Sequence, residues 1–442
     1  MKITVVGAGK SGVAAALLAK KLGHSVFLTE LNSNENYLNV ISVLEENKIG
    51  FEFGGHSDGL LNETELVVAS PGVPPTSEVL RSALIRRIPI ISELEFASQQ
   101  ITNPIVAITG TNGKTTTTAL TQYLFEVAGV RSVACGNIGV PLSEIVLNGI
   151  EETTWLIIET SSYQLDRITT FAPKIAVILN ITPDHLTYHG SFEAYTLSKH
   201  SITKNQKRTD VLIVNDDNLV SIPKGMGEAN VVSFSIENEP SFGMFADEKV
   251  LYFVEDGTRI HCLFKEELSL PGTHNCYNSM AAALIARSAG ITVSNIAKGL
   301  KTFAGVEHRL EFVRELNGVR YINDSKATNV DSTKYALTSY SAPIIWIAGG
   351  RGDNNDYSML NTSITKNVRC ILAIGEEADE ILTHFKDITS KKCSSFENAI
   401  QEAYKEAKAG EVVLFTPACK SFDMFKNYEE RGTVYKLLVN AL

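Results

Sequence analysis

The chain has 442 residues, of which 44% are hydrophobic and 20% are charged, and its formal net charge is −10. This length predicts about two to four domains, and the composition excludes a disordered or fibrous protein. Because the chain has no Lys- or Arg-rich block, no apolar run of about eighteen residues and no apolar leader, we expect a soluble, cytoplasmic protein without nucleic-acid or membrane partners.

The first predicted module covers residues 1–92 and alternates short apolar runs with helical patterns. The turn Gly7-Ala8-Gly9-Lys10-Ser11-Gly12 fits G-x-G-x-x-G, and Glu30 ends the next strand. Alone, this pattern favours a nicotinamide dinucleotide, but its glycines also suit close helix–strand packing without any ligand. We expect a doubly wound unit with strands Ile3–Val6, Val26–Thr29 and Leu66–Ala69 and a helix over Ser11–Leu22.

The central module, residues 93–305, opens on the most informative segment of the chain. Residues 105–117 read as a buried strand, a glycine-hinged loop and a helix start. Backbone N–H groups of such a loop converge on polyphosphate oxygens, while Lys114 neutralises charge and the Thr115 hydroxyl ligates Mg²⁺. Ile108 stands where the usual signature has a glycine, so the loop is a variant. A tight turn is the alternative, but a Lys-Thr pair adds nothing to a turn, and we expect ATP here.

Other polar residues of the central module are predicted at the same sheet edge. Glu159 ends a strand and is a candidate Mg²⁺ ligand, and His185 follows the next strand. Lys199 lies on a predicted helix, where sequence reasoning alone does not separate a catalytic lysine from a solvated one. We expect strands Trp155–Glu159, Ile175–Asn180 and Val211–Asn215, a small antiparallel addition over Val231–Leu270 and a long helix ending at Arg287.

The third module, residues 306–442, repeats the α/β pattern. His308-Arg309 stands at its entrance, and the polar run from Asn323 to Asn329 suits a ligand carboxylate or ribose, or is a solvated loop. We expect strands Val319–Asn323, Ile344–Gly349, Cys370–Ile374 and Val412–Phe415 and a helix over Phe396–Lys408. The fold class is therefore three consecutive α/β modules, in which the first and third are Rossmann-like and the central one is a P-loop-type ATPase.

The cysteines contain no C-x-x-C pair and indicate neither a zinc site nor a disulfide framework. We expect reduced, mostly buried thiols at Cys135, Cys262, Cys276, Cys370, Cys393 and Cys419.

Three motifs together resemble the Mur ligase family, and the resemblance covers the chain end to end. The run from Thr109 to Thr116 is typical of the wider family, whereas the runs Glu159–Leu165 and Asp324–Asn329 resemble its D-glutamate-adding members. The resemblance implies an ATP-dependent amide-bond-forming ligase of peptidoglycan precursor synthesis that uses ATP and two Mg²⁺ ions. It also implies UDP-N-acetylmuramoyl-L-alanine and D-glutamate as substrates, an acyl-phosphate intermediate and a monomer.

The resemblance assigns roles to individual residues. For catalysis it implies Lys114, Glu159, His185 and Lys199, and for metal binding Thr115, Glu159, His185 and Lys199, the lysine as a carbamate. For ATP it implies Gly110, Thr111, Asn112, Gly113, Lys114, Thr115, Thr116, Asn275, Asn278, Arg309 and Asp324. For the UDP-sugar it implies Gly9, Ser11, Gly12, Ser70, Gly72, Asn137, Ser161, Gln164 and His185, and for D-glutamate Lys326, Thr328, Ser421 and Phe422.

The chain departs from the family pattern in places. Where some relatives place a lysine for the incoming amino acid, this chain has Asp353, and Arg351 is the candidate substitute; Tyr428 replaces a usual Phe. Another Mur-type or folylpolyglutamate-type amide ligase with a different amino acid or acceptor is the nearest alternative. A NAD-dependent oxidoreductase leaves the ATP loop, Glu159 and Lys199 unexplained, and a nucleotide sensor would bind ATP without turnover.

Overall fold

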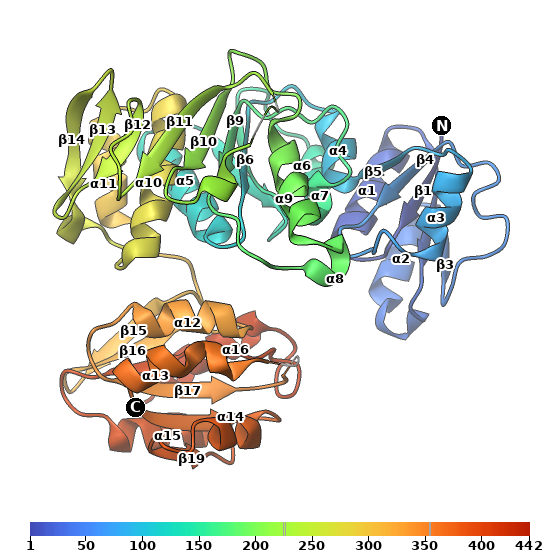
Figure 1. Cartoon of the computed structure of the whole chain (residues 1–442). Helices are drawn as coiled ribbons and strands as arrows, with labels where there is room; N and C mark the ends of the chain where they lie inside the picture. Colours follow the sequence, from blue (N-terminus) through green and yellow to red (C-terminus); the bar gives the residue numbers. More distant parts are fainter. Residues whose placement is uncertain (224, 226, 353–354) are drawn as a thin grey trace. The chain divides into compact units, whose positions relative to one another are not determined.

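The computed structural model describes residues 1–223, 225, 227–352 and 355–442. These residues form two compact units, and Figure 1 traces the chain through them. The first unit comprises residues 1–269 and 274–303, and the second comprises residues 270–273 and 304–442. Over the described ranges the strands form three sheets, each rich in parallel pairs, which confirms the predicted α/β class. The domain limits expected at residues 92/93 and 305/306 stay predictions.

The N-terminal sheet of the first unit is a parallel doubly wound sheet in the order β3-β2-β1-β4-β5. Because β1 pairs with β2 on one side and with β4 on the other, the strand order reverses next to β1, where such sheets bind ligands. The strands are β1 (Lys2–Val6), β2 (Ser25–Glu30), β3 (Gly50–Phe53), β4 (Leu66–Ala69) and β5 (Ile90–Ser92). The helices are α1 (Lys10–Lys21), η1 (Asn34–Asn36), α2 (Leu38–Glu46), α3 (Glu78–Ile85) and α4 (Glu93–Ser98).

The central sheet of the first unit has the order β14-β13-β12-β11-β10-β9-β6-β8-β7. Its strands are β6 (Ile105–Thr109), β7 (Ser132–Gly136), β8 (Trp155–Glu159), β9 (Ile175–Ile178), β10 (Val211–Asn215), β11 (Asn230–Ser235), β12 (Gly243–Ala246), β13 (Val250–Glu255) and β14 (Thr258–Phe264). Its helices are α5 (Lys114–Val127), α6 (Leu142–Asn148), α7 (Ser162–Leu165), α8 (Leu186–His189), α9 (Phe192–His200), η2 (Ser201–Thr203), η3 (Leu219–Ser221), η4 (Lys265–Glu267), α10 (Thr273–Ser288) and α11 (Val293–Thr302).

The antiparallel addition expected over Val231–Leu270 is wrong in its first half. β11 runs parallel to β10, and β12 runs parallel to β11; only β13 and β14 are antiparallel. For β11 the reason is the connection from β10, residues 216–229, which is long enough to return the chain to the end of the sheet where the parallel strands begin; the direction of β12, which follows after residues 236–242, has no such local explanation. The parallel sheet therefore continues two strands further than the sequence pattern indicated.

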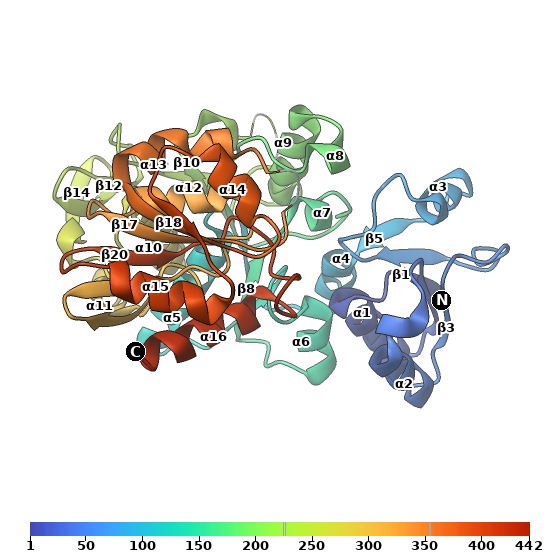
Figure 2. The ribbon, with the colours of Figure 1, turned by 90° about the horizontal axis from the view of Figure 1, so that it is seen from below.

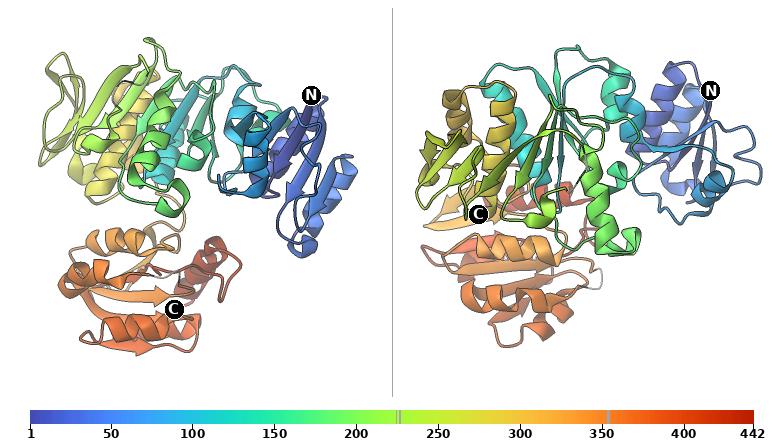
Figure 3. Two further views of the ribbon diagram at one scale, coloured as in Figure 1. Left: turned by 45° about the vertical axis from the view of Figure 1, so that its right-hand side comes forward. Right: turned by 45° about the horizontal axis from the view of Figure 1, so that its top comes forward.

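The second unit holds one sheet in the order β15-β16-β20-β17-β18-β19, in which only β15 is antiparallel to its neighbour. Both faces are buried, because Trp346 and Ile345, adjacent in β17, belong to different apolar clusters, and Figure 3 shows helices on both sides of this sheet. The strands are β15 (Glu311–Leu316), β16 (Val319–Asn323), β17 (Ile344–Gly349), β18 (Val368–Ile374), β19 (Ser390–Lys392) and β20 (Val412–Phe415). The helices are α12 (Val330–Thr338), η5 (Tyr357–Leu360), α13 (Asn361–Asn367), α14 (Ala378–His384), α15 (Phe396–Glu406) and α16 (Tyr428–Asn440).

Two further observations bear on the expectations above. All six cysteines are buried free thiols. Within the described residues, no helix combines the length and the apolar character that crossing a membrane requires.

Helix α4 connects the two sheets of the first unit, and Figure 2 shows it beside α1 and α6. Its buried Glu95 carboxylate accepts backbone N–H bonds from Thr169 (3.0 Å), Thr170 (2.8 Å) and Phe171 (2.9 Å) and further bonds from both threonine hydroxyls. Burial alone raises the pKa of Glu95, but these hydrogen bonds outweigh it and lower the pKa to about 2. The ionised carboxylate therefore holds the loop that follows α7.

We expect Glu95→Gln to destabilise the first unit by about 3 kcal/mol at neutral pH, because an amide cannot accept this set of donors. Since the folded pKa lies below the unfolded value, the contribution of Glu95 is present above about pH 4.5 and is lost as the pH falls toward 2. Urea unfolding of a Trp346→Phe background, in which Trp155 reports on the first unit, measures the change. Exposed Glu152→Gln is the matched control, and equal unfolding free energies for the two variants would contradict the assignment.

Candidate active site

The phosphate-type loop predicted from the sequence connects β6 to α5. Gly110 and Gly113 have φ values of +154° and +88°, in the region that favours glycine. A Cβ atom on Gly113 would lie 2.3 Å from Oδ1 of Asn278, which also accepts a hydrogen bond from the Thr117 hydroxyl (3.3 Å). Asn278 in turn donates to Asn275 Oδ1 (3.3 Å). The structure thus brings Asn278 of α10 to the loop, with Asn275 hydrogen-bonded to it.

Sequence reasoning treated Asn180 only as the end of a strand and assigned it no role. The side chain of Asn180 accepts a hydrogen bond from the Asn112 N–H (2.9 Å) and donates one to the Asn112 carbonyl (3.1 Å). Thr111 is fixed in a similar way, because its hydroxyl contacts the Thr182 carbonyl (3.1 Å) and Tyr195 Oη (3.0 Å). Residues that follow β9 and a residue of α9 therefore fix the conformation of the loop. The sequence signal that could have identified Asn180 is an Asn two residues beyond a buried strand.

Two lysines donate to one carbonyl oxygen in this loop. Lys114 Nζ lies 2.9 Å from the oxygens of Gly110 and Thr111, and Lys199 Nζ lies 2.8 Å from the Gly110 oxygen. Lys199 is only 2% exposed, and its ammonium lies 4.7 Å from the centre of the Tyr195 ring. Tyr195 and Lys199 share a face of α9 because they are four residues apart, a spacing that sequence reasoning could have used.

The pKa of Lys199 lies well below the usual value for a lysine. Burial is the largest cause, and the nearby positive charge of Lys114 lowers the pKa further, whereas Asp184 and Glu159 oppose the shift. These charges act on Lys199 because Lys114, Asp184 and Glu159 lie near its amino group; sequence reasoning had placed Lys199 only on a helix. The surroundings favour the neutral amine, which is the nucleophilic form of a lysine side chain.

Glu159 ends β8 and is 2% exposed as a residue. Its Oε1 atom accepts a hydrogen bond from Asn137 Nδ2 at 3.1 Å, and the Asn137 N–H donates to the Glu159 carbonyl at 2.8 Å. Since β6, β8 and β9 are parallel, this carboxylate lies at the same edge as the first turn of α5, where Thr115 is located. One carboxylate and one hydroxyl beside a phosphate loop form a donor set that suits Mg²⁺.

His185 precedes α8 with a left-handed backbone (φ +52°) and pairs with Asp184, whose Oδ2 lies 3.5 Å from Nε2. Burial lowers the pKa of His185, and the charges of Lys199 and Lys114 lower it further against the effect of Asp184, which favours the neutral imidazole. Among the described residues, no group of three His, Cys, Asp or Glu side chains forms a preformed metal site. The predicted metal donors also include the hydroxyl of Thr115 and the amine of Lys199, so this finding does not test them. Their role in metal binding stays a prediction.

A cavity of about 460 Å³ lies at the switch point of the N-terminal sheet. Five of the predicted UDP-sugar residues line it: Gly9, Ser11, Ser70, Gly72 and Asn137. Gly12 lies beneath the turn, where a Cβ would be 1.9 Å from the Gly7 carbonyl, and it serves close helix–strand packing. Because Asn137 also contacts Glu159, this cavity reaches toward the phosphate loop within the first unit.

The position of Glu30 at the end of a strand is part of the sequence pattern that favoured a dinucleotide. In the structure its carboxylate accepts hydrogen bonds from residues of nearby turns. Oε2 accepts from the Ala8 N–H (2.8 Å), and Oε1 accepts from the backbone and side chain of Asn32 (2.9 and 2.8 Å). A carboxylate used in this way is not directed at a ribose, which removes the main support for NAD. In the same cavity, Ser77 Oγ is buried and has no hydrogen-bond partner among the described residues.

Ser161 and Gln164 form a capping box at the start of α7. Gln164 Oε1 accepts from both the backbone N–H and the hydroxyl of Ser161 (3.0 Å each), whereas its buried Nε2 has no partner in the described part of the chain. This amide donor is the feature that supports a substrate contact there. These two residues and His185 do not line the 460 Å³ cavity.

In the second unit, Asp324 accepts hydrogen bonds from the Leu310 N–H (3.1 Å) and the Thr416 hydroxyl (2.8 Å). Burial raises the pKa of Asp324 to about 7, although Arg309, Thr416 and Leu310 act in the opposite direction. The buried Nε of Arg309 has no hydrogen-bond partner within the described ranges. Arg309 therefore has a polar group that a ligand could satisfy.

The polar run after β16 is organised by Arg431, a fully buried residue of α16 that sequence reasoning missed. Its guanidinium donates to the Ser325 hydroxyl (3.1 Å), the Ser325 carbonyl (2.8 Å) and the Cys419 carbonyl (3.1 Å). The ammonium of Lys326 lies 5.5 Å from the centre of the Tyr428 ring. These contacts place the loop that carries Lys326 and Thr328.

The other candidates of the second unit have different surroundings. Ser421 is buried, and Phe422 is 58% exposed. Arg351 donates from Nε (3.0 Å) and Nη2 (2.9 Å) to the two carboxylate oxygens of Glu376, so a ligand would compete with this ion pair. Asp353 lies outside the described residues. A D-glutamate contact of Arg351 stays a prediction.

Gly113→Ala is expected to raise the KM for ATP roughly tenfold, a loss of about 1.4 kcal/mol, because the added methyl group displaces Asn278 from the loop. Steady-state kinetics at varied ATP concentrations measure the effect. Gly129→Ala is the matched control, since Gly129 also has a positive φ (+72°) but has open space around its Cβ position. An equal change in both variants would mean that backbone strain alone is responsible.

Comparison with known proteins agrees with this geometry. Residues 1–92 match the Mur ligase MurD-like N-terminal domain, residues 108–286 the Mur ligase middle domain, and residues 308–419 the Mur ligase glutamate ligase domain. The chain is 42% identical to the UDP-N-acetylmuramoylalanine--D-glutamate ligase of Salinibacter ruber, over all of this chain and 98% of the relative. It is 38% identical to the enzyme of the same name from Koribacter versatilis, over all of this chain and 97% of the relative.

Solved structures share the fold at low sequence identity. The UDP-N-acetylmuramate-alanine ligase of Thermotoga maritima superposes with a TM-score of 0.61 at 18% identity, covering all of both chains. The MurF ligase of Thermotoga maritima, solved in complex with ADP, superposes with a TM-score of 0.60 at 17% identity, covering 94% of this chain and 95% of that one.

Proposed function

The chain belongs to the Mur ligase family, and from this premise we propose that it joins D-glutamate to UDP-N-acetylmuramoyl-L-alanine in an ATP-dependent reaction of peptidoglycan precursor synthesis. The observation that carries the proposal is the meeting of Lys114, Lys199 and Glu159 at one sheet edge, linked through Asn137 to the 460 Å³ cavity. The full-length relatives with this activity in their names support the choice of amino acid and acceptor.

The reaction proceeds by two transfers at one carboxylate. A carboxylate oxygen of the L-alanyl end attacks the γ-phosphorus of ATP, which gives an acyl phosphate and ADP. The amine of D-glutamate then attacks the acyl carbon, inorganic phosphate leaves and the amine loses a proton. Lys114, at the start of α5, compensates charge on the transferring phosphoryl group, and the loop amides orient it. The remaining contribution of the chain is to position the reactants.

Thr115, Glu159, His185 and Lys199 are proposed to hold two Mg²⁺ ions, with Lys199 as a carbamate. The low pKa of Lys199 supports this role, because a neutral amine adds CO₂ and the product is an oxygen ligand. When bound, Mg²⁺ would supply charge neutralisation at the phosphate oxygens. The chain's own residues hold the ligand oxygens in place, as Asn137 does for Glu159.

The remaining assignments follow from the resemblance and are proposals of the same kind. For ATP they are Asn275, Asn278, Arg309 and Asp324; for the UDP-sugar Ser11, Ser70, Gly72, Ser161 and Gln164; for D-glutamate Lys326, Thr328, Ser421 and Phe422. The unpartnered Nε2 of Gln164 and Nε of Arg309 support two of them. We also propose that the protein is a monomer, which light scattering during size-exclusion chromatography tests.

The decisive experiment measures phosphate release from ATP by the purified full chain. We expect release only when UDP-N-acetylmuramoyl-L-alanine and D-glutamate are both present, together with a product heavier than the acceptor by one glutamyl residue. Parallel reactions with L-glutamate, D-alanine, lysine and diaminopimelate distinguish this reaction from those of other amide ligases. Release that is indifferent to the acceptor, or a preference for another amino acid, would overturn the proposal.

A further inference from the structure

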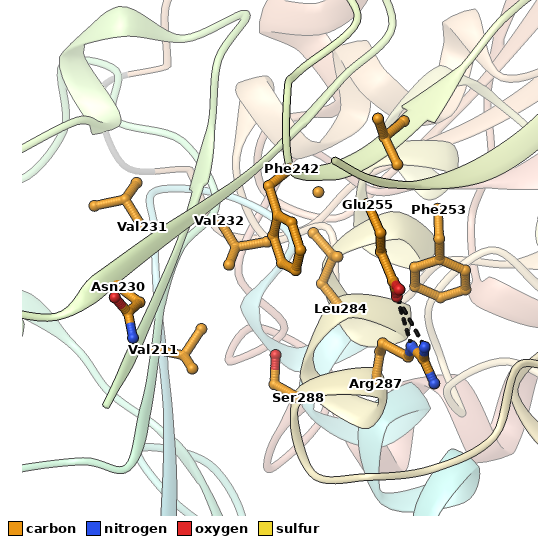
Figure 4. Close-up of a pocket in the computed structure, with 12 residues that line it drawn as sticks. Val211, Asn230, Val231, Val232, Phe242, Phe253, Glu255, Leu284, Arg287 and Ser288 are labelled. Atoms are coloured by element: carbon orange, nitrogen blue, oxygen red, sulfur yellow. Dashed lines mark hydrogen bonds and ion pairs between the residues drawn. The ribbon is translucent and has the colours of Figure 1, made fainter. Parts of the chain in front are cut away.

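A second cavity, of about 550 Å³, lies in the first unit (Figure 4). It is at the end of the central sheet where the parallel strands begin, whereas the phosphate loop is at the end where they finish. Val211 and Asn230 begin the parallel strands β10 and β11, whereas the phosphate loop follows the end of β6. The cavity is closed on one side by the last turn of α10, which contributes Leu284, Arg287 and Ser288. It is therefore separate from the catalytic groups, and no step of the proposed reaction uses it.

One strand at this cavity has an unpaired edge. The Asn230 N–H donates to the Asp210 carbonyl (2.9 Å), so Asn230 faces β10, and the alternation along a parallel strand turns the peptide groups of Val231 to the other side. On that side β12 begins only at Gly243, opposite Ser233. Among the described residues, no strand pairs with Val231 there, and its side chain is 56% exposed. A backbone donor and a backbone acceptor therefore remain at the cavity wall.

The charges at the cavity cancel. Arg287 donates from Nε (3.0 Å) and Nη2 (2.8 Å) to a single oxygen of Glu255, Oε1, as the dashed lines in Figure 4 show. Arg287 Nη1 and Glu255 Oε2 have no hydrogen-bond partner among the residues described, so one further donor and one further acceptor remain beside each other. Such a pair attracts neither an anion nor a cation strongly, but it matches the N–H and C=O of a single residue in an extended chain, which point to the same side.

The rest of the wall is apolar and partly open. The ring of Phe242, 48% exposed, points toward Leu284 in Figure 4, and Val232 lies beside it. The volume falls within the range of ligand cavities, roughly 300–1,000 Å³. Because a strand rises about 3.3 Å per residue, the free edge at Asn230–Val232 accommodates about three residues of an extended ligand.

We propose that this cavity binds a short extended peptide with apolar side chains, which adds as a strand beside Val231. Main-chain hydrogen bonds to a free sheet edge provide affinity, and the apolar wall selects the side chains, as in other cases of strand addition. The Glu255–Arg287 pair contacts the N–H and C=O of one residue of the peptide. The proposal is independent of the ligase reaction, because it uses none of its residues.

The test uses the ²H,¹⁵N-labelled full chain and the peptide acetyl-Leu-Val-Leu-amide. We expect saturable shifts of the Val231 and Val232 amide signals and at least fivefold slower hydrogen exchange at the Val231 N–H when the peptide is bound. The same peptide methylated at every amide nitrogen should bind at least tenfold more weakly. Absence of saturable shifts up to millimolar peptide, or equal binding of the methylated peptide, would overturn the proposal.

Two variants separate strand addition from simple apolar contact. Val231→Pro removes the N–H that faces the cavity and should weaken binding at least tenfold, whereas Val231→Thr keeps that N–H and a β-branched shape and should bind normally. Phe242→Ser removes the apolar wall at an exposed position and should also weaken binding, without altering the backbone pairing of β11. Peptide binding that is unchanged in both Val231→Pro and Phe242→Ser would place the ligand elsewhere.

Discussion

Replacing Lys114 by alanine is expected to lower kcat for phosphate release roughly 10²- to 10³-fold, the usual effect of removing one charge-stabilising donor from a transition state. Its ammonium donates to the carbonyls of Gly110 and Thr111, at the loop where the phosphates are proposed to bind. The fold should survive, because the side chain is not part of the apolar core. Coupled-enzyme kinetics and thermal unfolding of the same preparation measure both effects.

Lys204→Ala is the matched control for this change, since Lys204 follows the short helix η2 as an exposed lysine of the same unit. It should leave kcat and Tm unchanged. A Lys114→Ala enzyme that keeps more than about one tenth of the wild-type kcat would contradict the role of Lys114 in phosphoryl transfer.

Lys199→Met is expected to lower kcat at least roughly 10²-fold. The free energy of unfolding should stay unchanged or rise by about 1 kcal/mol. The two effects separate because Lys199 is buried beside the positive charge of Lys114, so an apolar side chain of similar volume suits the fold at least as well. If the carbamate is required, removing dissolved CO₂ from the wild-type enzyme should also lower activity, and bicarbonate should restore it.

Steady-state kinetics and thermal unfolding of Lys199→Met test the expected loss of turnover at unchanged stability. A ¹³C NMR signal from ¹³C-bicarbonate that is present in the wild type and absent in Lys199→Met tests the second. Lys199→Arg serves as a control that keeps the positive charge but cannot form the carbamate, and it should be inactive as well. Activity of Lys199→Met near the wild-type level would exclude a role for this residue in metal binding.

Much of the fold was predictable because its signals are local. Strands such as Trp155–Glu159 and Val412–Phe415 are short apolar runs bounded by polar residues, and the structure has them at the predicted limits. The phosphate loop was predictable for the same reason, since a buried strand, two glycines and a Lys-Thr pair are consecutive in the chain. Glu159 could be placed at the same edge because parallel strands end together.

The rest depends on contacts between distant residues. Nothing near Lys199 in the sequence shows that this residue is only 2% exposed and that its Nζ shares an acceptor with Lys114. The parallel direction of β11 and β12 depends on how the chain returns from β10, which apolar patterning does not indicate. Likewise, the contacts of Arg431 in α16 with Ser325, which lies 106 residues earlier, have no local signal.

The carbonyl oxygen shared by Lys114 and Lys199 leads us to expect an order of assembly if Lys199 carries a carbamate. Because both amino groups lie near one acceptor, the positive charge of Lys114 disfavours the protonated form of Lys199, whereas the same charge would attract an anionic adduct on Lys199. A triphosphate bound to Lys114 would repel the same adduct. By reciprocal linkage, carbon dioxide should load onto the resting protein more readily than onto the nucleotide-filled one.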